Sequence, residues 1–246
     1  MSRRKWLVFA LISVMLVLSG CGNTTAPINP ENGIWDRYFV YPLSKSLDWF
    51  ADLFGGQYGL SILIVTVIIR LIILPLTLKQ YKSSKRMQEI QPELKKIKEK
   101  HKDNPQKQQE ETMKLFQSQG VNPLAGCLPI FIQMPILIAL YNAIVRNSEI
   151  SGHTFLWMQL GEKDPYYILP LIAALTTFIQ QKMMSSQMTA QMQSLMFIFP
   201  VLIFVMAMNF AAALPLYWIY SNIFTIVQTY FIYGRSQANT KGEVSK

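Results

Sequence analysis

The sequence predicts an all-α membrane protein with five transmembrane helices, and two observations carry that prediction. The first is composition: 51% of the 246 residues are hydrophobic and the mean hydropathy is +0.22, as in chains that cross the membrane several times as one helical domain. The second is the spacing of apolar runs, since a span needs about 20 apolar residues. Five runs approach or reach that length: Tyr58–Leu78, Pro129–Val145, Tyr166–Gln181, Leu195–Phe210 and Leu214–Tyr233.

The distribution of charge predicts how these spans are oriented. Between Lys79 and Val121 there are eleven Lys/Arg against six Asp/Glu, whereas between Gly22 and Gln57 there are two against four. Because cytoplasmic loops near spans carry the excess of Lys and Arg, we expect the first segment in the cytoplasm and the second outside. Five spans then place the basic tail, residues 234–246, in the cytoplasm. The net charge of +9 says more about orientation than about nucleic acid, and no specific nucleic-acid partner is expected.

The first twenty residues have the architecture of a secretion signal that ends at a cysteine. A basic start precedes the apolar run Trp6–Leu18, as in signal peptides, and the string Leu18-Ser19-Gly20-Cys21 resembles the bacterial lipobox. The resemblance implies that residues 1–20 are a lipoprotein signal peptide and that the Cys21 thiol carries an acyl chain such as palmitate outside the cell. An uncleaved first span with a chance cysteine is the alternative. We expect Cys127 to be a small buried hydrophobe, and no disulfide.

An outer helix is predicted between the anchor and the first span. In the outer segment, residues 21–57, aromatic and aliphatic side chains recur every three or four positions over Trp35–Phe54. That spacing predicts an amphipathic helix in the outer interface, with its aromatic residues at headgroup level and a break or kink at Pro42.

A cytoplasmic hairpin is predicted after the first span. A narrow apolar seam at spacings of three and four runs from Met87 to Ile97, as in paired helices. Asn104-Pro105 then predicts a turn, and a second polar helix follows. We therefore expect a short, mobile helical hairpin over Ser84–Gln119.

One charged side chain lies in the middle of a predicted span. Arg70 interrupts the first apolar run, and the other four runs contain no Asp or Glu that could neutralise it. A cation at that depth costs roughly 2.5–3.5 kcal/mol, and a guanidinium has five donors to satisfy. The sequence therefore predicts a water-filled cavity around Arg70, in which it can receive an anionic group of another molecule.

Polar side chains recur at helical spacing on the spans. They are Thr66 and Thr77 beside Arg70; Gln133 with Tyr141; Thr176 and Thr177 with Gln180; and Trp218, Ser221, Asn222, Thr225 and Thr229. Such groups face the bundle interior or a cavity. Ordinary interhelical hydrogen bonds, worth about 0.6 kcal/mol each, are the alternative role.

No motif in the sequence points to catalysis or to a metal. His101 and His153 lack companions at metal-ligand spacing, Cys127 has no nearby histidine, and there is no Walker, GxSxG or HExxH motif. The spans also lack the acidic residues of a proton relay. We expect neither an enzyme nor a bound cofactor or metal.

The order of segments and several stretches of sequence resemble one family. A lipobox precedes the outer helix, YGLSILIVTVIIRLIILPL carries the arginine, and after the hairpin come GVNPLAGCLPIFIQMPI, FLWMQLGEKDPYYILP and LPLYWIYSNIFTIVQTYF. Over residues 21–234 the sequence resembles a YidC-type insertase of the YidC/Oxa family, in the lipoprotein form of Gram-positive bacteria. The resemblance implies a five-span core, residues 58–233, around a hydrophilic groove that is open to the cytoplasm and to lipid but closed outside.

The resemblance also implies roles for single residues. Arg70 takes the position of the family's groove arginine, and Gln133, Gln180 and Trp218 fall at positions that line the same groove, with Gln181 as the alternative to Gln180. The hairpin matches the one that receives substrates. The tail is shorter than the basic tails that assist ribosome docking, so strong ribosome binding is not expected.

The expected function is the insertion and folding of integral membrane proteins in the bacterial cell membrane, without a nucleotide. Expected partners are nascent membrane proteins and the lipid bilayer, with lipoproteins as a further client class and the Sec translocon and, weakly, the ribosome as further partners. The protein would act alone or with the translocon. Two alternatives stay open: a partner-dependent assembly factor of the secretion channel and, on weaker grounds, a small-solute channel or transporter.

Overall fold

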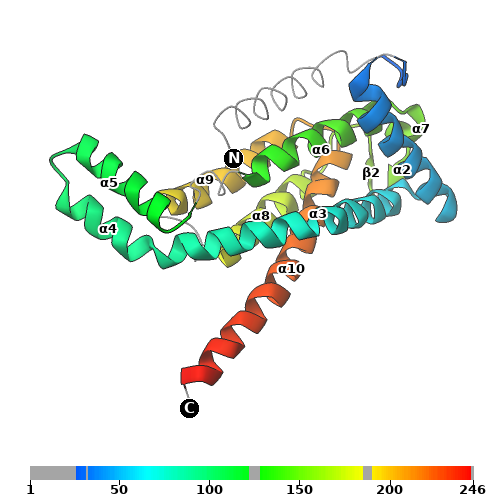
Figure 1. Cartoon of the computed structure of the whole chain (residues 1–246). Coiled ribbons are helices and arrows are strands. Elements are labelled where there is room, and N and C mark those ends of the chain that lie inside the picture. The colour runs from blue at the N-terminus through cyan, green and yellow to red at the C-terminus, as the bar shows by residue number, and fades with distance from the viewer. Residues whose placement is uncertain (1–25, 32, 122–127, 185–189, 245–246) are drawn as a thin grey trace.

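The computed structural model describes residues 26–31, 33–121, 128–184 and 190–244, and most of them are helical (Figure 1). The predicted signal peptide, Cys21 and Cys127 lie outside these residues. In chain order the elements are the π-helical turn η1 (Asp36–Val40), α2 (Tyr41–Leu53), α3 (Tyr58–Glu89), α4 (Gln91–Lys100), α5 (Pro105–Ser118), α6 (Leu128–Val145), α7 (Ser148–Gly152), β1 (Thr154–Phe155), β2 (Met158–Gln159), α8 (Ile168–Met184), α9 (Ala190–Ala207) and α10 (Ala213–Val244).

By length and composition, one helix in the described part of the chain can cross a membrane alone. It is Tyr58–Met87 within α3, which is 30 residues long and reaches a mean hydropathy of 2.6. Three shorter apolar helices, Phe131–Val145, Ile168–Met184 and Phe197–Ala207, coincide with three more of the predicted spans. The pattern fits a membrane protein of several helices, and the count of five spans stays a prediction.

The hydrophobic core lies where α2, α3, α6, α8 and α10 meet. α10 packs along α8 and α3, and α9 packs along α8. Ile62, Leu140 and Tyr217 are among the fully buried side chains of this core. The outward faces of α8 and α9 instead expose large apolar side chains such as Leu171 and Phe197, as expected of helices that face lipid rather than water.

The outer amphipathic segment is present as η1 followed by α2, with the change from π to α geometry directly before Pro42. Its aromatic residues do not all sit where the headgroup prediction placed them. Trp35 is only 6% exposed and stacks on Phe39 at 4.8 Å between ring centroids, and both pack into the protein core, whereas Tyr38 and Trp49 are exposed. The core of the bundle itself uses the apolar face of this helix, so only the opposite face is left for the membrane interface.

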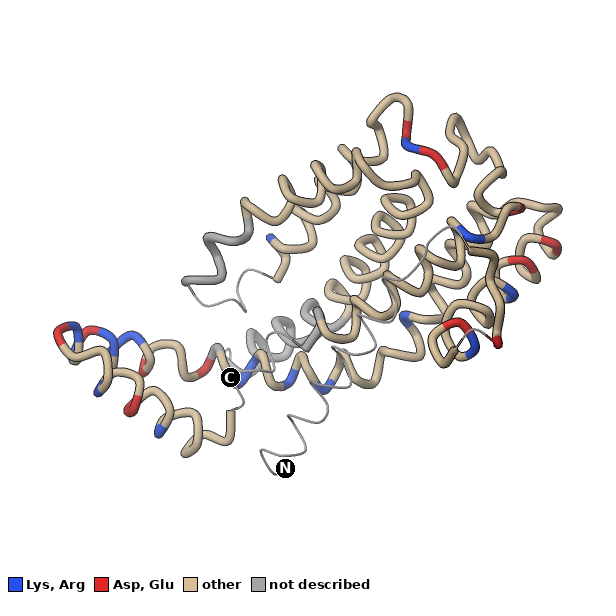
Figure 2. The backbone as a smooth tube through the Cα atoms, turned by 90° about the horizontal axis from the view of Figure 1, so that it is seen from above, with Lys and Arg blue, Asp and Glu red and all other residues tan. Residues whose placement is uncertain are grey.

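The helices α4 and α5 lie side by side at the end of the molecule opposite α2 (Figure 1). α3 continues without interruption to Glu89, and Ile90 separates it from α4. A small cluster of buried Ile90, Leu94 and Val121 joins the two arms. The Asn104 side chain caps α5 by accepting a hydrogen bond from the Lys107 N–H at 3.0 Å. Figure 2 shows charged residues gathered on this hairpin and at the opposite end of the molecule, with few along the helices between.

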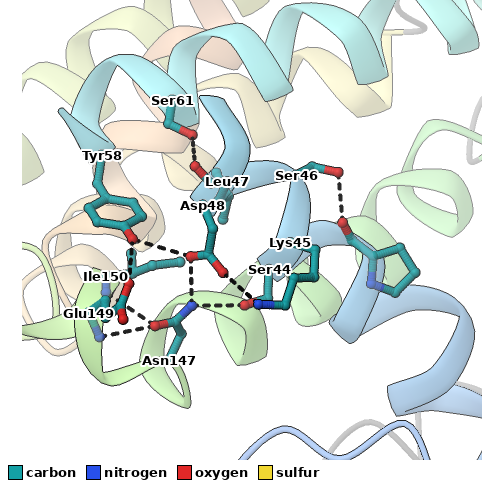
Figure 3. A network of polar contacts seen from close by, with 11 residues as sticks. Ser44, Lys45, Ser46, Leu47, Asp48, Tyr58, Ser61, Asn147, Glu149 and Ile150 are labelled. Atoms are coloured by element: carbon teal, nitrogen blue, oxygen red, sulfur yellow. Dashed lines mark hydrogen bonds and ion pairs between the residues drawn. The ribbon is translucent and has the colours of Figure 1, made fainter. Parts of the chain in front are cut away.

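A polar network joins α2, α3 and α7 at the end that the charge distribution places outside (Figure 3). The Asn147 amide donates to Ser44 Oγ at 2.9 Å and to Asp48 Oδ1 at 3.0 Å. The Tyr58 hydroxyl lies 3.2 Å from a carboxylate oxygen of Asp48 and 3.2 Å from one of Glu149. The start of α7, which is distant in sequence, is thereby tied by side chains to the neighbouring helices α2 and α3.

A two-stranded hairpin completes this end, and the all-α prediction missed it. β1 and β2 pair antiparallel. The backbone N–H groups of Ala212 and Ala213, where the chain enters α10, donate to Glu162 O at 2.6 Å and Leu160 O at 3.1 Å. Since the contact with α10 uses backbone groups, no pattern of side chains in the sequence predicts it.

Candidate functional site

Arg70 points from the middle of α3 toward α6 and α10. Its Nη2 donates to Gln133 Oε1 at 3.2 Å and also to Ser221 Oγ. No Asp or Glu within the described residues forms an ion pair with it. Arg70 as a residue is half-buried, and in the described part of the chain its charge is held by neutral acceptors. A carboxylate brought to it from outside would meet an uncompensated cation.

The Gln133 amide has a second partner that the sequence did not suggest. Its Nε2 donates to Tyr217 Oη at 2.6 Å, and Tyr217 is 2% exposed. One chain of hydrogen bonds therefore runs from Tyr217 through Gln133 to Arg70 and Ser221, across three helices. Tyr217 precedes Ser221 by four residues and so shares its face of α10; that spacing was the available signal.

A second polar cluster joins α8 to α10. The Trp218 indole Nε1 donates to Thr177 Oγ1 at 3.1 Å, and the Asn222 amide donates to Thr177 Oγ1 at 2.9 Å and to Thr176 Oγ1 at 3.1 Å. These contacts are the interhelical hydrogen bonds that were the alternative role for Thr176, Thr177 and Asn222. The Trp218 indole is held by α8, and its hydrogen bond leads away from Arg70.

In the described part of the chain, no hydrogen bond joins Gln180 to either cluster. Gln180 is half-buried on α8, and the hydrogen bonds of Arg70 and Gln133 go to other residues. Its neighbour Gln181 has a buried Oε1 without a hydrogen-bond partner among the described residues. Of the four residues predicted to line a groove, the structure brings Arg70 and Gln133 together, while the role of Gln180 stays a prediction.

An apolar cavity of about 390 Å³ lies between α6, α8, α9 and α10. Trp218 forms part of its wall, together with Tyr141 and Phe210, whose rings meet edge to face at 5.6 Å. Arg70 and Gln133 do not line it. Tyr141 was grouped with Gln133, but eight helical residues turn the side chain by about 80°, which places it on the cavity side. The hydrophilic groove around Arg70 stays a prediction.

Known proteins identify the family of this chain. Residues 49–240 match the family described as the 60Kd inner membrane protein. The chain belongs to this family, the YidC/Oxa family. It is 51% identical to membrane protein insertase YidC 2 of Bacillus anthracis, with 100% of both chains covered. It is 52% identical to membrane protein insertase MisCA of Bacillus subtilis, over 95% of this chain and 93% of that one.

A solved structure of the same family has the same fold. It is described as an active YidC insertase with the first transmembrane domain resolved, and it matches 81% of this chain with a TM-score of 0.65 at 28% identity. This chain spans 47% of that longer one. YidC/Oxa membership, which the arginine-bearing span and the LPLYWIYSN stretch predicted, is confirmed.

Proposed function

We propose that this protein is a membrane-protein insertase that takes nascent membrane proteins from the cytoplasm into the lipid bilayer. The observation that carries the proposal is Arg70, a cation inside the helix of the described residues that is long and apolar enough to cross a membrane, held by Gln133 and Ser221 instead of an acid. The names of its relatives, membrane protein insertases at about half identity, support the same conclusion.

Arg70 attracts the acidic part of a client. A carboxylate binds a guanidinium through two parallel hydrogen bonds in which both partners are charged, whereas Gln133 and Ser221 offer the guanidinium neutral acceptors. It therefore competes well against the amide and hydroxyl that now occupy Arg70. A short acidic segment drawn to this depth has less apolar thickness left to cross. Burial of the client's apolar stretch in lipid then drives completion at about 0.8 kcal/mol per CH₂, so no nucleotide or cofactor is required.

The path is open toward the cytoplasm and closed outside. Two features support closure: the backbone bonds of Ala212 and Ala213 to the segment that follows β2 and the side-chain network around Asp48. Five spans, with Gln180 and Trp218 on the wall of a hydrophilic groove beside Arg70, complete the arrangement. The α4–α5 pair, within Ser84–Gln119, gives the client its first contact in the cytoplasm.

The protein sits in the bacterial cell membrane with its two ends on opposite sides. Acylated Cys21 anchors the outer segment after removal of residues 1–20, and the tail, residues 234–246, lies in the cytoplasm. The Sec translocon is a candidate partner for long clients, and lipoproteins are a further client class. The short tail favours weak ribosome contact.

The experiment uses liposomes that contain only this protein and a single-span client with a short translocated tail. Wild type, Arg70→Ala and Arg70→Lys are compared on two clients, one with acidic residues in the tail and one with the corresponding amides. We expect Arg70→Ala to lower the insertion rate of the acidic client at least tenfold and Arg70→Lys to keep most of that rate. The insertion rate of the amide client should change little in either variant. Equal insertion of both clients by all three proteins would remove charge attraction from the mechanism.

The two alternatives give different results in the same vesicles. A partner-dependent assembly factor inserts nothing without the secretion channel, even as wild type. A small-solute channel or transporter admits a fluorescent solute to vesicles when no client is present. Insertion by the wild type without solute flux supports the insertase.

A further inference from the structure

The Gln133 carboxamide has two ends with opposite hydrogen-bonding character, and both are used. Its NH₂ group donates to Tyr217 Oη at 2.6 Å, and its oxygen accepts from Arg70 Nη2 at 3.2 Å. A guanidinium carries only donors. If the amide were reversed, its NH₂ would face Arg70 and that hydrogen bond would be lost. The guanidinium therefore fixes the amide orientation, and in that orientation the Tyr217 hydroxyl accepts from the NH₂ group and ties the Gln133 side chain to α10.

Tyr217 acts on Arg70 through the side chains that its hydroxyl contacts, Gln133 and, on the same helix, Ser221. It is 2% exposed and belongs to the hydrophobic core, so a client cannot reach it. Its position on α10 is fixed by that packing, whereas Gln133 and Arg70 are each half-buried. The rigid end of the hydrogen-bonded chain is thus Tyr217, and the end that a client can reach is Arg70.

The contacts of Arg70 compete with a client for the same donors. Any carboxylate that binds the Nη2 group must displace Gln133 Oε1 or Ser221 Oγ, which already accept from it. When only a fraction of the molecules has a free binding site, the apparent affinity equals the intrinsic affinity multiplied by that fraction. A carboxylate can displace the neutral Gln133 amide, because it adds an opposite charge and a second parallel hydrogen bond.

We propose that Tyr217 is a positioning residue that, through Gln133, holds Arg70 in a closed latch. Closed means that Arg70 Nη2 is hydrogen-bonded to Gln133 and Ser221, and the acidic segment of a client must displace these acceptors to open it. This inference rests on the proposed insertase function and adds a device that sets its selectivity. Clients with weakly acidic or neutral segments leave the latch closed, and strongly acidic ones open it.

The test is Tyr217→Phe, which removes the hydroxyl and keeps the ring that fills the core. Insertion rates into the same liposomes are measured against client concentration, so that KM and kcat separate, for the acidic and the amide client. Because a hydrogen bond inside a membrane protein is worth about threefold in equilibrium, we expect KM for the acidic client to fall about threefold. We expect kcat for the acidic client, and both KM and kcat for the amide client, to stay unchanged.

Tyr141→Phe is the matched control, since it removes a tyrosine hydroxyl from α6 on the side of the apolar cavity. It should change neither client. Gln133→Met, which removes the acceptor at similar volume, is the second variant and should lower KM for the acidic client as Tyr217→Phe does, even if Tyr217→Phe fails to accumulate.

Each outcome decides the proposal. A lower KM for the acidic client in either variant, absent in the control, supports the latch. An unchanged or higher KM, or an equal change for both clients, overturns the latch and leaves charge attraction intact. A wild type that does not prefer the acidic client overturns charge attraction and the latch together.

Discussion

The ion pair between Asp36 and Arg146 gives the sharpest prediction about stability. Arg146 binds Asp36 through two parallel bonds, Nη1 to Oδ1 at 2.8 Å and Nη2 to Oδ2 at 2.5 Å, and it also donates to the carbonyls of Ala26 and Pro27 at 2.8 and 3.1 Å. The two side chains are 6% and 9% exposed. This one arginine therefore attaches the start of the described chain and η1 to the end of α6.

Removing either partner leaves the other charge buried without compensation. Breaking a buried pair in this way costs about 3–5 kcal/mol. We expect Asp36→Asn and Arg146→Gln each to lower the free energy of unfolding by that amount, and the double variant to lose less than the sum. The control is Lys45→Gln, which breaks the Lys45–Asp48 contact at 3.4 Å with a 61% exposed lysine. Exposed pairs contribute about 0–1 kcal/mol.

The same pair predicts a pH dependence with a definite sign. The hydrogen bonds from Arg146 lower the pKa of Asp36 below its ordinary value, and they outweigh burial, which raises it. A lowered carboxyl pKa stabilises the fold fully above the unfolded value of about 3.9 and loses that contribution as pH falls through the folded value. We expect no change from this pair between about pH 5 and 8.

The assay is unfolding of the purified protein in detergent or nanodiscs, by heat and by a strong detergent, at neutral pH and on acidification. Additive effects of Asp36→Asn and Arg146→Gln, or losses no larger than that of Lys45→Gln, would refute the reasoning. So would equal acid sensitivity of wild type and Asp36→Asn.

Two further predictions concern the outer end. A Cβ added at Gly59 would lie 2.3 Å from the Phe155 ring, so Gly59→Ala should cost about 1–3 kcal/mol in the same unfolding assay; Gly152→Ala, with nothing within 4 Å of the added atom, is the control, and equal stability of the two variants contradicts the packing argument. Cys21→Ala should abolish metabolic labelling of the protein with palmitate and Cys127→Ser should keep it; label that survives loss of Cys21 rules out this anchor.

Sequence reasoning located Arg70 because a cation inside an apolar run costs free energy however the helices pack. Arg70 can therefore be recognised without knowing which residues surround it. Gln133 followed from its resemblance to a family position and its place in a span. Tyr217 was missed because a tyrosine in an apolar run is typical of a core residue, and Tyr217 is indeed part of the core. Its hydroxyl finds Gln133 only where α6 and α10 meet in three dimensions.

The outer end shows a different limit. Trp35 lies on an amphipathic helix whose apolar face fits a membrane interface and a protein core equally well, and periodicity alone cannot tell which surface covers it. The contact of Ala212 and Ala213 with the segment after β2 depends on backbone N–H groups, which every residue except proline carries. Neither feature leaves a distinctive mark in the sequence.

The break between α3 and α4 at Ile90 lies at a fixed distance from Arg70. From Arg70 to Ile90 α3 is one uninterrupted helix, and twenty residues at the helical rise correspond to about 30 Å. A client that touches both Arg70 and the α4–α5 pair must bridge that distance with about nine residues of extended chain. If a client meets the α4–α5 pair first and Arg70 second, as proposed, a translocated tail shorter than this has to leave the pair before it reaches Arg70.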